Sequence, residues 1–232
     1  MRFTKISTYS LLSLLFACAP LAAHADDQDD NYISYTYAEA LAGVMSLKTT
    51  VPTGTGTSSS ETDSIGMVGL DGSYGFDRLF DFGKYLDVQG SAMAGFGTVG
   101  GNTLDLGIFS GGVGAHVNFH PSLGAVSAFI TAEEQSTAVS VAGTSNTNSN
   151  SLIVYGVRWM ILDSYEWRFF GTSQGGGSSS SGSPVGGNTL NLQFNWVAHP
   201  NQPSYYIGAQ FQHQNQSGST SNSLFVVGGY RW

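Results

Sequence analysis

The sequence contains few charged residues, a single cysteine and no long apolar run. Charged residues make up 10% of the 232 residues, against about 25% in ordinary soluble domains. The formal net charge of −8 argues against a nucleic-acid partner, which would need a basic surface. Aromatic residues make up 12% of the chain, a share too high for a disordered protein. Some feature other than surface charge must therefore keep the protein from aggregating.

The first residues predict a cleaved signal peptide. Arg2 and Lys5 precede the apolar run Leu11–Ala19, and Ala23 and Ala25 form a small-x-small cleavage site. The apolar run is too short to span a bilayer as a helix. We therefore predict three segments, which are a signal peptide at 1–25, an acidic N-terminal segment at 26–31 and one domain at 32–232.

The single cysteine allows a second interpretation of this region. Leu15-Phe16-Ala17-Cys18 resembles a lipoprotein signal, in which Cys18 would become the lipidated N-terminus. Phe16 is bulky at a position where that signal favours a small residue. If cleavage follows Ala25 instead, no cysteine remains and no disulfide can form.

After residue 31 the chain alternates between apolar and polar residues in runs separated by breaks. No stretch has about 18 consecutive apolar residues, so no membrane helix is expected. Period-two alternation over such runs predicts β-strands. About ten strands are expected, with eight as the alternative, near 32–47, 63–76, 85–97, 103–119, 123–139, 150–162, 165–172, 188–198, 204–214 and 222–232.

The breaks between these runs are of two kinds, which take turns along the chain. One kind is long and rich in Ser, Thr, Gly and Asn, and the other is a tight turn such as His120-Pro121-Ser122. We predict long loops at Lys48–Asp63, Val141–Asn150, Thr172–Gly187 and Asn215–Asn222, with Thr98–Asn102 as a short member. Such alternation is typical of an antiparallel meander, and an even number of strands brings both termini to the tight-turn end.

The two faces of the strands decide between a barrel and a soluble sandwich. Residues 190–196 alternate large apolar side chains with Asn and Gln, and residues 205–214 follow the same rule. Amides and hydroxyls on the polar face suit a lumen better than a solvated sandwich exterior. We therefore predict an all-β fold, a closed antiparallel up-and-down transmembrane barrel with its apolar face toward lipid. Aromatic residues near strand ends, Tyr35 and Tyr37 among them, are expected in interfacial girdles. A secreted sandwich is the alternative.

The last strand carries a further signal. Its alternating face ends in an aromatic residue, which resembles the C-terminal assembly signal of outer-membrane barrels. The residues on that face are Leu224, Val226, Gly228, Tyr230 and Trp232. The resemblance implies that the barrel-assembly machinery recognises this strand during insertion.

The whole layout resembles the small Gram-negative outer-membrane barrels of the OmpX, Ail and OmpW type. It is more loosely similar to a family of exported barrels from xanthomonads, on the segments Tyr35–Ala40, Gly69–Tyr74, Gly111–Gly114 and Tyr155–Arg158. The resemblance covers most of residues 32–232 as a pattern, without a diagnostic motif. It implies a single barrel in the cell outer membrane, in contact with the lipid bilayer and lipopolysaccharide. It transfers no catalytic residue.

Six charged side chains fall on faces that point into the predicted lumen, namely Glu39, Glu133, Arg158, Glu166, Arg168 and Arg231. Because an unpaired buried charge is very costly, we expect these side chains to pair. Glu133 and Arg158 are expected to point into the lumen from neighbouring strands, and so are Glu166 and Arg168 with Glu39 and Arg231. An ion-paired plug follows from packing alone, whereas the alternative is a narrow gated pore whose charges set selectivity. A barrel of eight to ten strands leaves little lumen, which favours the plug.

No catalytic residue, metal site or cofactor is expected. The predicted long loops hold only Lys48, Glu61 and Asp63 as charges, and His116 and His213 lie in strands without a partnered nucleophile. The acidic segment lacks the spaced oxygen ligands of a calcium loop. The predicted role is therefore non-enzymatic, either envelope-structural or in surface interaction through the hydroxyl-rich loops of a monomer. The alternative is a narrow, porin-like passive channel for ions or small solutes.

Overall fold

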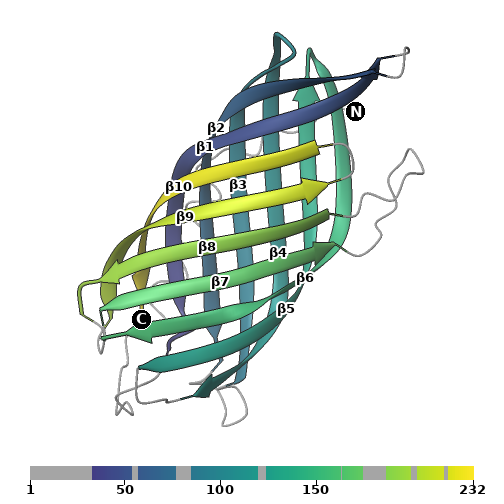
Figure 1. Cartoon of the computed structure of the whole chain (residues 1–232). Coiled ribbons are helices and arrows are strands. Elements are labelled where there is room, and N and C mark those ends of the chain that lie inside the picture. Colours follow the sequence, from purple (N-terminus) through teal and green to yellow (C-terminus); the bar gives the residue numbers. More distant parts are fainter. Residues whose placement is uncertain are drawn as a thin grey trace.

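The alternation along the chain is realised in ten strands that form one closed antiparallel barrel (Figure 1). The computed structural model describes residues 33–53, 57–76, 85–119, 124–162, 164–174, 187–199, 203–216 and 219–232. The strands are β1 (Tyr37–Thr53), β2 (Thr57–Gly75), β3 (Leu86–Val99), β4 (Asn102–Phe119), β5 (Ala125–Val141), β6 (Thr144–Ile161), β7 (Tyr165–Gln174), β8 (Gly187–Val197), β9 (Ser204–Gln216) and β10 (Ser219–Arg231). The barrel of ten strands is confirmed, and the alternatives of eight strands and of a sandwich are wrong.

The predicted signal peptide, with Ala23 and Ala25, lies outside the described residues, as do Cys18 and the acidic segment 26–31. The described chain contains no helix that is long and apolar enough to cross a membrane.

Closure of the barrel depends on the pairing of β1 with β10. The ladder runs from Tyr37 opposite Arg231 to Thr49 opposite Ser219. The backbone N–H of Trp232 extends it by donating to the carbonyl of Thr36 at 3.0 Å. We call the end of the barrel where β1 begins and β10 ends the base, and the opposite end the hairpin end.

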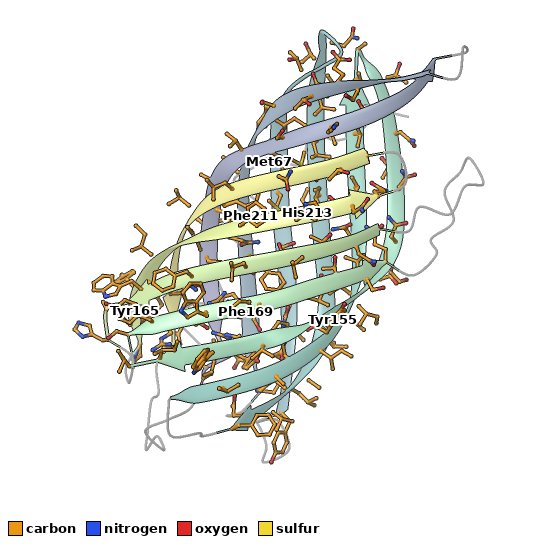
Figure 2. The ribbon with its side chains drawn as sticks, in the orientation of Figure 1. Met67, Tyr155, Tyr165, Phe169, Phe211 and His213 are labelled. Atoms are coloured by element: carbon orange, nitrogen blue, oxygen red, sulfur yellow. The ribbon has the colours of Figure 1, made fainter. Side chains whose placement is uncertain are left out.

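The residues predicted to face outward and those predicted to face the lumen do so in the barrel. On β10 Val226 is 61% exposed, whereas its neighbour Phe225 is 1% exposed. On β8 Leu190 and Trp196 point outward, whereas Gln193 is buried in the lumen. Figure 2 shows the outward residues of the near wall as sticks, among them the aromatic rings of β6, β7 and β9. The period-two reading of the strands is therefore correct at side-chain level.

The lumen differs from the expectation in one respect, because part of it is apolar. Leu41, Met67, Phe225 and Val227 pack together inside the barrel, with the partly buried Met93 against them. These residues come from β1, β2, β10 and β3, which form one side of the wall. Amides therefore fill only part of the lumen, and an apolar core fills the rest.

The prediction of long hydroxyl-rich loops is wrong for the segments that the structure describes. Between β5 and β6 only Ala142 and Gly143 are left out of the strands, with φ values of 50° and 80°. Positive φ at both central residues is the geometry of a two-residue hairpin turn, whose twist matches that of the strands. Serine and threonine side chains pair across such a ladder, so a hydroxyl-rich composition does not prevent strand formation.

The other hydroxyl-rich segments follow the same rule. β1 runs on to Thr53 and β2 begins at Thr57, so most of the predicted loop Lys48–Asp63 is strand. Thr98–Asn102 narrows to Gly100 and Gly101, both with positive φ. The predicted loop Asn215–Asn222 also shortens, because β9 ends at Gln216 and β10 begins at Ser219. Residues 175–186 lie outside the described chain.

We expect Gly43→Ala to destabilise the seam between β1 and β10. A Cβ at Gly43 would collide with the backbone carbonyl of Leu224, which cannot move without breaking the ladder. Overpacking of this kind costs about 1–3 kcal/mol. Gly66→Ala is the matched control, because the nearest atom to its Cβ is the carbonyl oxygen of Phe96 at 3.6 Å. The measurement is the temperature at which the fast-migrating folded band is lost on a gel; equal temperatures for the two variants would contradict the expectation.

Candidate functional site

Two arginines face each other in the lumen near the base. The ladder between β6 and β7 places Arg158 directly opposite Arg168, and like charges in that position repel. The Glu166 carboxylate binds both guanidinium groups, with Oε1 2.6 Å from Arg158 Nη2 and 3.1 Å from Arg168 Nε. All three side chains are almost completely buried. Glu166 therefore makes this pairing of β6 with β7 possible.

A second carboxylate joins the first strand to this group. Glu39 Oε2 accepts hydrogen bonds from Arg168 Nη1 at 3.0 Å and from the Tyr206 hydroxyl at 2.6 Å. Gln193 Nε2 donates to the same oxygen at 3.2 Å. Because β1, β7, β8 and β9 supply these groups, the network crosses the lumen instead of following one strand. Charged hydrogen bonds of this kind are stronger than neutral ones.

Aromatic rings alternate with the guanidinium groups across the lumen. The Tyr35 ring stacks on the His116 ring at 3.6 Å between centroids. Arg158 Cζ lies 4.8 Å from the Tyr35 centroid, between the Tyr35 and Tyr37 rings. Arg158 and Arg168 lie 5.4 and 4.6 Å from the Tyr37 ring, and Arg168 lies 5.4 Å from the Tyr206 ring. These distances are those of cation–π contacts. We call the six side chains the lumen stack: His116, Tyr35, Arg158, Tyr37, Arg168 and Tyr206.

Sequence reasoning missed the aromatic members of the lumen stack. Tyr35 and Tyr37 were expected in an interfacial girdle, but their rings lie inside the barrel. Tyr35 lies four residues and Tyr37 two residues before Glu39, so both share its inward face. The alternation along the chain therefore already indicated that their rings enter the lumen. Position near a strand end predicted the orientation of these rings less well than the alternation did, because lumen-facing residues also occur at the strand ends of the base.

A buried Asp–His pair was also missed. Asp87 Oδ2 lies 2.9 Å from His116 Nδ1, and both side chains are buried. Asp87 faces Gly114 across the ladder, two residues from His116, so the pair is a diagonal one. A Cβ at Gly114 would lie 2.5 Å from Asp87 Oδ1. Gly114, opposite Asp87, therefore leaves the space that the Asp87 side chain occupies, and this glycine was the sequence signal for an inward Asp87.

The structure does not bring all six predicted lumen charges together. Arg231 is buried near the base, as are Glu39, Arg158, Glu166 and Arg168. Glu133 is the exception: it lies on the strand next to that of Arg158, as expected, but the two side chains are not opposite each other. On the ladder between β5 and β6 Glu133 faces Leu152, whereas Arg158 faces Ser127, six residues nearer the base. Glu133 is hydrogen-bonded to Ser110 instead.

A cavity of about 180 Å³ adjoins the lumen stack. Tyr35, Tyr37 and Arg158 lie on its wall, and so do Asp71 and Glu133. The lining also combines amide and hydroxyl side chains with apolar ones. The amides and hydroxyls are Gln89, Ser91, Ser110, Gln135, Thr172, Asn191, Gln193, Gln210 and Gln212, and the apolar residues are Leu41, Leu70, Met93, Phe129, Leu152, Val154 and Phe170. Such a lining can hydrogen-bond water or a small polar solute.

The arrangement offers hydrogen bonds and charge but no activated nucleophile among the described residues. Nε2 of His116, the nitrogen that would accept a proton from a nucleophile, is buried and has no hydrogen-bond partner within that part of the chain. The described ranges also contain no group of three or more side chains placed to hold a metal ion.

Comparison with known proteins gives similarity of fold at low sequence identity. No family model and no curated protein matches the chain. Neisserial surface protein A is 11% identical over 86% of this chain and 98% of its own, with a TM-score of 0.36. Ail, the attachment invasion locus protein of Yersinia pestis, is 12% identical over 86% of this chain and 100% of its own, with a TM-score of 0.33.

A third similar structure is the COG4313 outer membrane channel from Pseudomonas putida F1. It is 9% identical over 90% of this chain and 100% of its own, with a TM-score of 0.41. The chain thus resembles small Gram-negative outer-membrane β-barrels. At these identities and scores the resemblance says nothing about individual residues or about a specific role.

We expect Glu166→Gln to destabilise the barrel by about 3–5 kcal/mol, because it leaves two facing buried guanidinium groups without their shared carboxylate. Glu134→Gln is the matched control, since Glu134 is exposed and its hydrogen-bond partner is Ser151 across the β5–β6 ladder. The measurement is the urea midpoint for loss of the folded band after refolding in detergent. A midpoint for Glu166→Gln equal to that of Glu134→Gln would show that the pairing of β6 with β7 does not depend on this carboxylate.

Proposed function

We propose that the protein is an integral barrel of a Gram-negative outer membrane, with a non-enzymatic role and a lumen closed to solutes. The observation that carries the proposal is the lumen stack, which crosses the lumen from His116 on β4 to Tyr206 on β9. Its charges are bound by Glu39 and Glu166, so the stack is held in place by ion pairs as well as by ring contacts. A barrel filled in this way is suited to an envelope-structural or surface-interaction role.

The membrane location is supported by the outer surface. Large apolar side chains are exposed on every one of the ten strands, from Val44 on β1 to Val226 on β10. Three of them, Tyr155, Phe169 and Phe211, are labelled on the near wall in Figure 2. A soluble monomer rarely exposes a continuous apolar surface of this extent. A bilayer would cover this apolar surface around the whole circumference of the barrel. Because the sheet is closed, no edge strand exposes unpaired backbone N–H and C=O groups to lipid.

Aromatic contacts at the base support the same location. The Tyr230 ring lies 4.8 Å from that of Tyr205 and 5.0 Å from that of Trp232. Trp167 and Phe194 make a similar contact at 4.8 Å on neighbouring strands. Such outward rings at one end of a barrel are suited to the membrane interface. In this proposal lipid and lipopolysaccharide surround the wall, and the last strand with Trp232 is what the assembly machinery recognises.

The hairpin end supports a role outside the membrane. On β6 the exposed apolar residues begin at Ile153, after the buried Leu152, and the eight positions 144–151 contain only Ser, Thr and Asn. At about 3.3 Å per residue this segment extends roughly 26 Å along the strand. Its partner strand β5 runs beside it to Val141. The surface that this hairpin would present is therefore a paired ladder, instead of the loop expected from the sequence.

The passive channel is the second candidate, and the cavity beside the lumen stack is the observation in its favour. Planar bilayers test the two. Purified protein that gives a fast-migrating unboiled band from washed outer membranes should produce no conductance steps. Steady steps would favour the channel. A soluble periplasmic pool, with none of the protein in the membrane, would contradict the membrane proposal itself.

We expect Val113→Arg to lower the yield of membrane-inserted barrel. Val113 is 65% exposed on the outer face, between Val88 on β3 and Ala132 on β5. Arginine on a lipid-facing midplane position costs about 2–4 kcal/mol. Thr147→Arg is the matched control, because Thr147 is exposed on the hairpin beyond the apolar surface. The measurement is the amount of folded band in washed membranes, and equal yields would contradict a bilayer around Val113.

A further inference from the structure

We propose that Tyr35 is a removable stopper of the lumen and that its withdrawal opens a narrow path for small cations. The proposal rests on the membrane location given above. It goes beyond a closed barrel, because it assigns the closure at the base to one side chain outside the strands and states which sign of ion would pass.

Two separate networks lie in the lumen near the base. Arg158 on β6 and Glu166 and Arg168 on β7 are tied to each other and, across the lumen, to Glu39 on β1. On β3 and β4 lies the buried pair of Asp87 and His116. None of these four ion pairs joins the first network to the second. A side chain between Arg158 and His116 therefore closes the part of the base that the first network leaves open.

Tyr35 occupies that space. Its ring lies 3.6 Å from the His116 ring on one side and 4.8 Å from Arg158 Cζ on the other. Its hydroxyl is hydrogen-bonded to Ser127 Oγ at 2.8 Å, on the wall of β5. Only 3% of the residue is exposed. Removing this side chain would separate the two networks by the thickness of a phenol ring.

The segment that carries Tyr35 lies outside the strands. Ile33 to Thr36 precede β1, and Ile33 is 1% exposed in the apolar core. Arg158 Nη1 donates to the Ser34 carbonyl at 2.9 Å, and Ser34 Oγ donates to the Trp232 carbonyl at 2.7 Å. The Trp232 N–H donates to the Thr36 carbonyl, and the Gly75 N–H donates to Thr36 Oγ1 at 3.1 Å. Withdrawal of the segment would break these bonds and expose Ile33, but it would leave the ladders of β1 from Tyr37 onward intact.

The space above the stopper is acidic. Tyr35 is part of the wall of the cavity of about 180 Å³, so its removal would join that cavity to the base. The Glu39 and Glu166 carboxylates on this side are neutralised by the two arginines. Asp71 and Glu133 also line the cavity, but their hydrogen-bond partners are the neutral hydroxyls of Tyr37 and Ser110.

Asp71 and Glu133, whose partners are hydroxyls, favour cations over anions in a narrow lumen when they are ionised. Beyond Glu133 toward the hairpin end the cavity is bordered by the amides of Gln135 and Gln212, which water can hydrate.

Single-channel recording in planar bilayers tests the proposal with purified full-length protein. Tyr35→Ala should give discrete conductance steps at potentials where the parent protein gives none. In a tenfold KCl gradient its reversal potential should shift toward that of K⁺. The control is Tyr205→Ala, which removes a tyrosine that is 74% exposed on the outer face and should stay closed. Adding Asp71→Asn and Glu133→Gln to Tyr35→Ala should keep the steps and abolish the K⁺ preference.

Each outcome decides one part. A folded Tyr35→Ala that stays closed, judged by its fast-migrating unboiled band, would overturn the stopper. Steps that favour Cl⁻, or a K⁺ preference unchanged by the two neutral substitutions, would overturn the role of the acidic pair. If Tyr35→Ala does not fold, Tyr35→Leu replaces it, because leucine keeps an apolar contact with His116 but leaves much of the ring space empty. A parent protein that conducts by itself would contradict the closed barrel of the proposed function.

Discussion

The meeting of two arginines on facing positions of β6 and β7 is the constraint on which the inside of this barrel depends. The ladder leaves Arg158 and Arg168 no route to solvent, and they can stay buried only because Glu166 lies between them. The same carboxylate accepts a hydrogen bond from Asn195 at 3.3 Å, which extends the network to β8. Glu39 then joins β1 to Arg168. Four strands that are not all neighbours are thus held in one arrangement by charge.

Outside the barrel the same alternation has the opposite result. Along each strand the residues alternate, and those that do not face the lumen face outward. Closure of β1 on β10 removes the free sheet edges, through which barrels could otherwise aggregate. The low charge of the sequence is consistent with the fold, because the charged side chains of the described residues lie mainly in the lumen or on the hairpins. An outer surface of this composition is poorly suited to contact with water.

The sequence predicts the parts of the structure that depend on local alternation. The inward position of Gln193 and the outward position of Val226 follow from period two within one strand, and both are confirmed. The partner of Glu133 depends on the register between strands, which local alternation does not contain, and in that register Glu133 faces Leu152. The hydroxyl-rich segments were misjudged because serine and threonine suit both loops and ladders. Two-residue turns such as Ala142-Gly143 need no long break.

Packing alone does not explain why the base of the lumen is charged. Elsewhere in the same lumen Leu41, Met67, Phe225 and Val227 fill the space with apolar contacts, and replacing a buried ion pair by apolar residues is often neutral or stabilising. The contacts between rings and guanidinium groups at the base depend on the observed register of the strands, and Tyr35 enters the stack from outside the ladder. Buried charge at the base is therefore better explained as a constraint on strand register than as a source of stability.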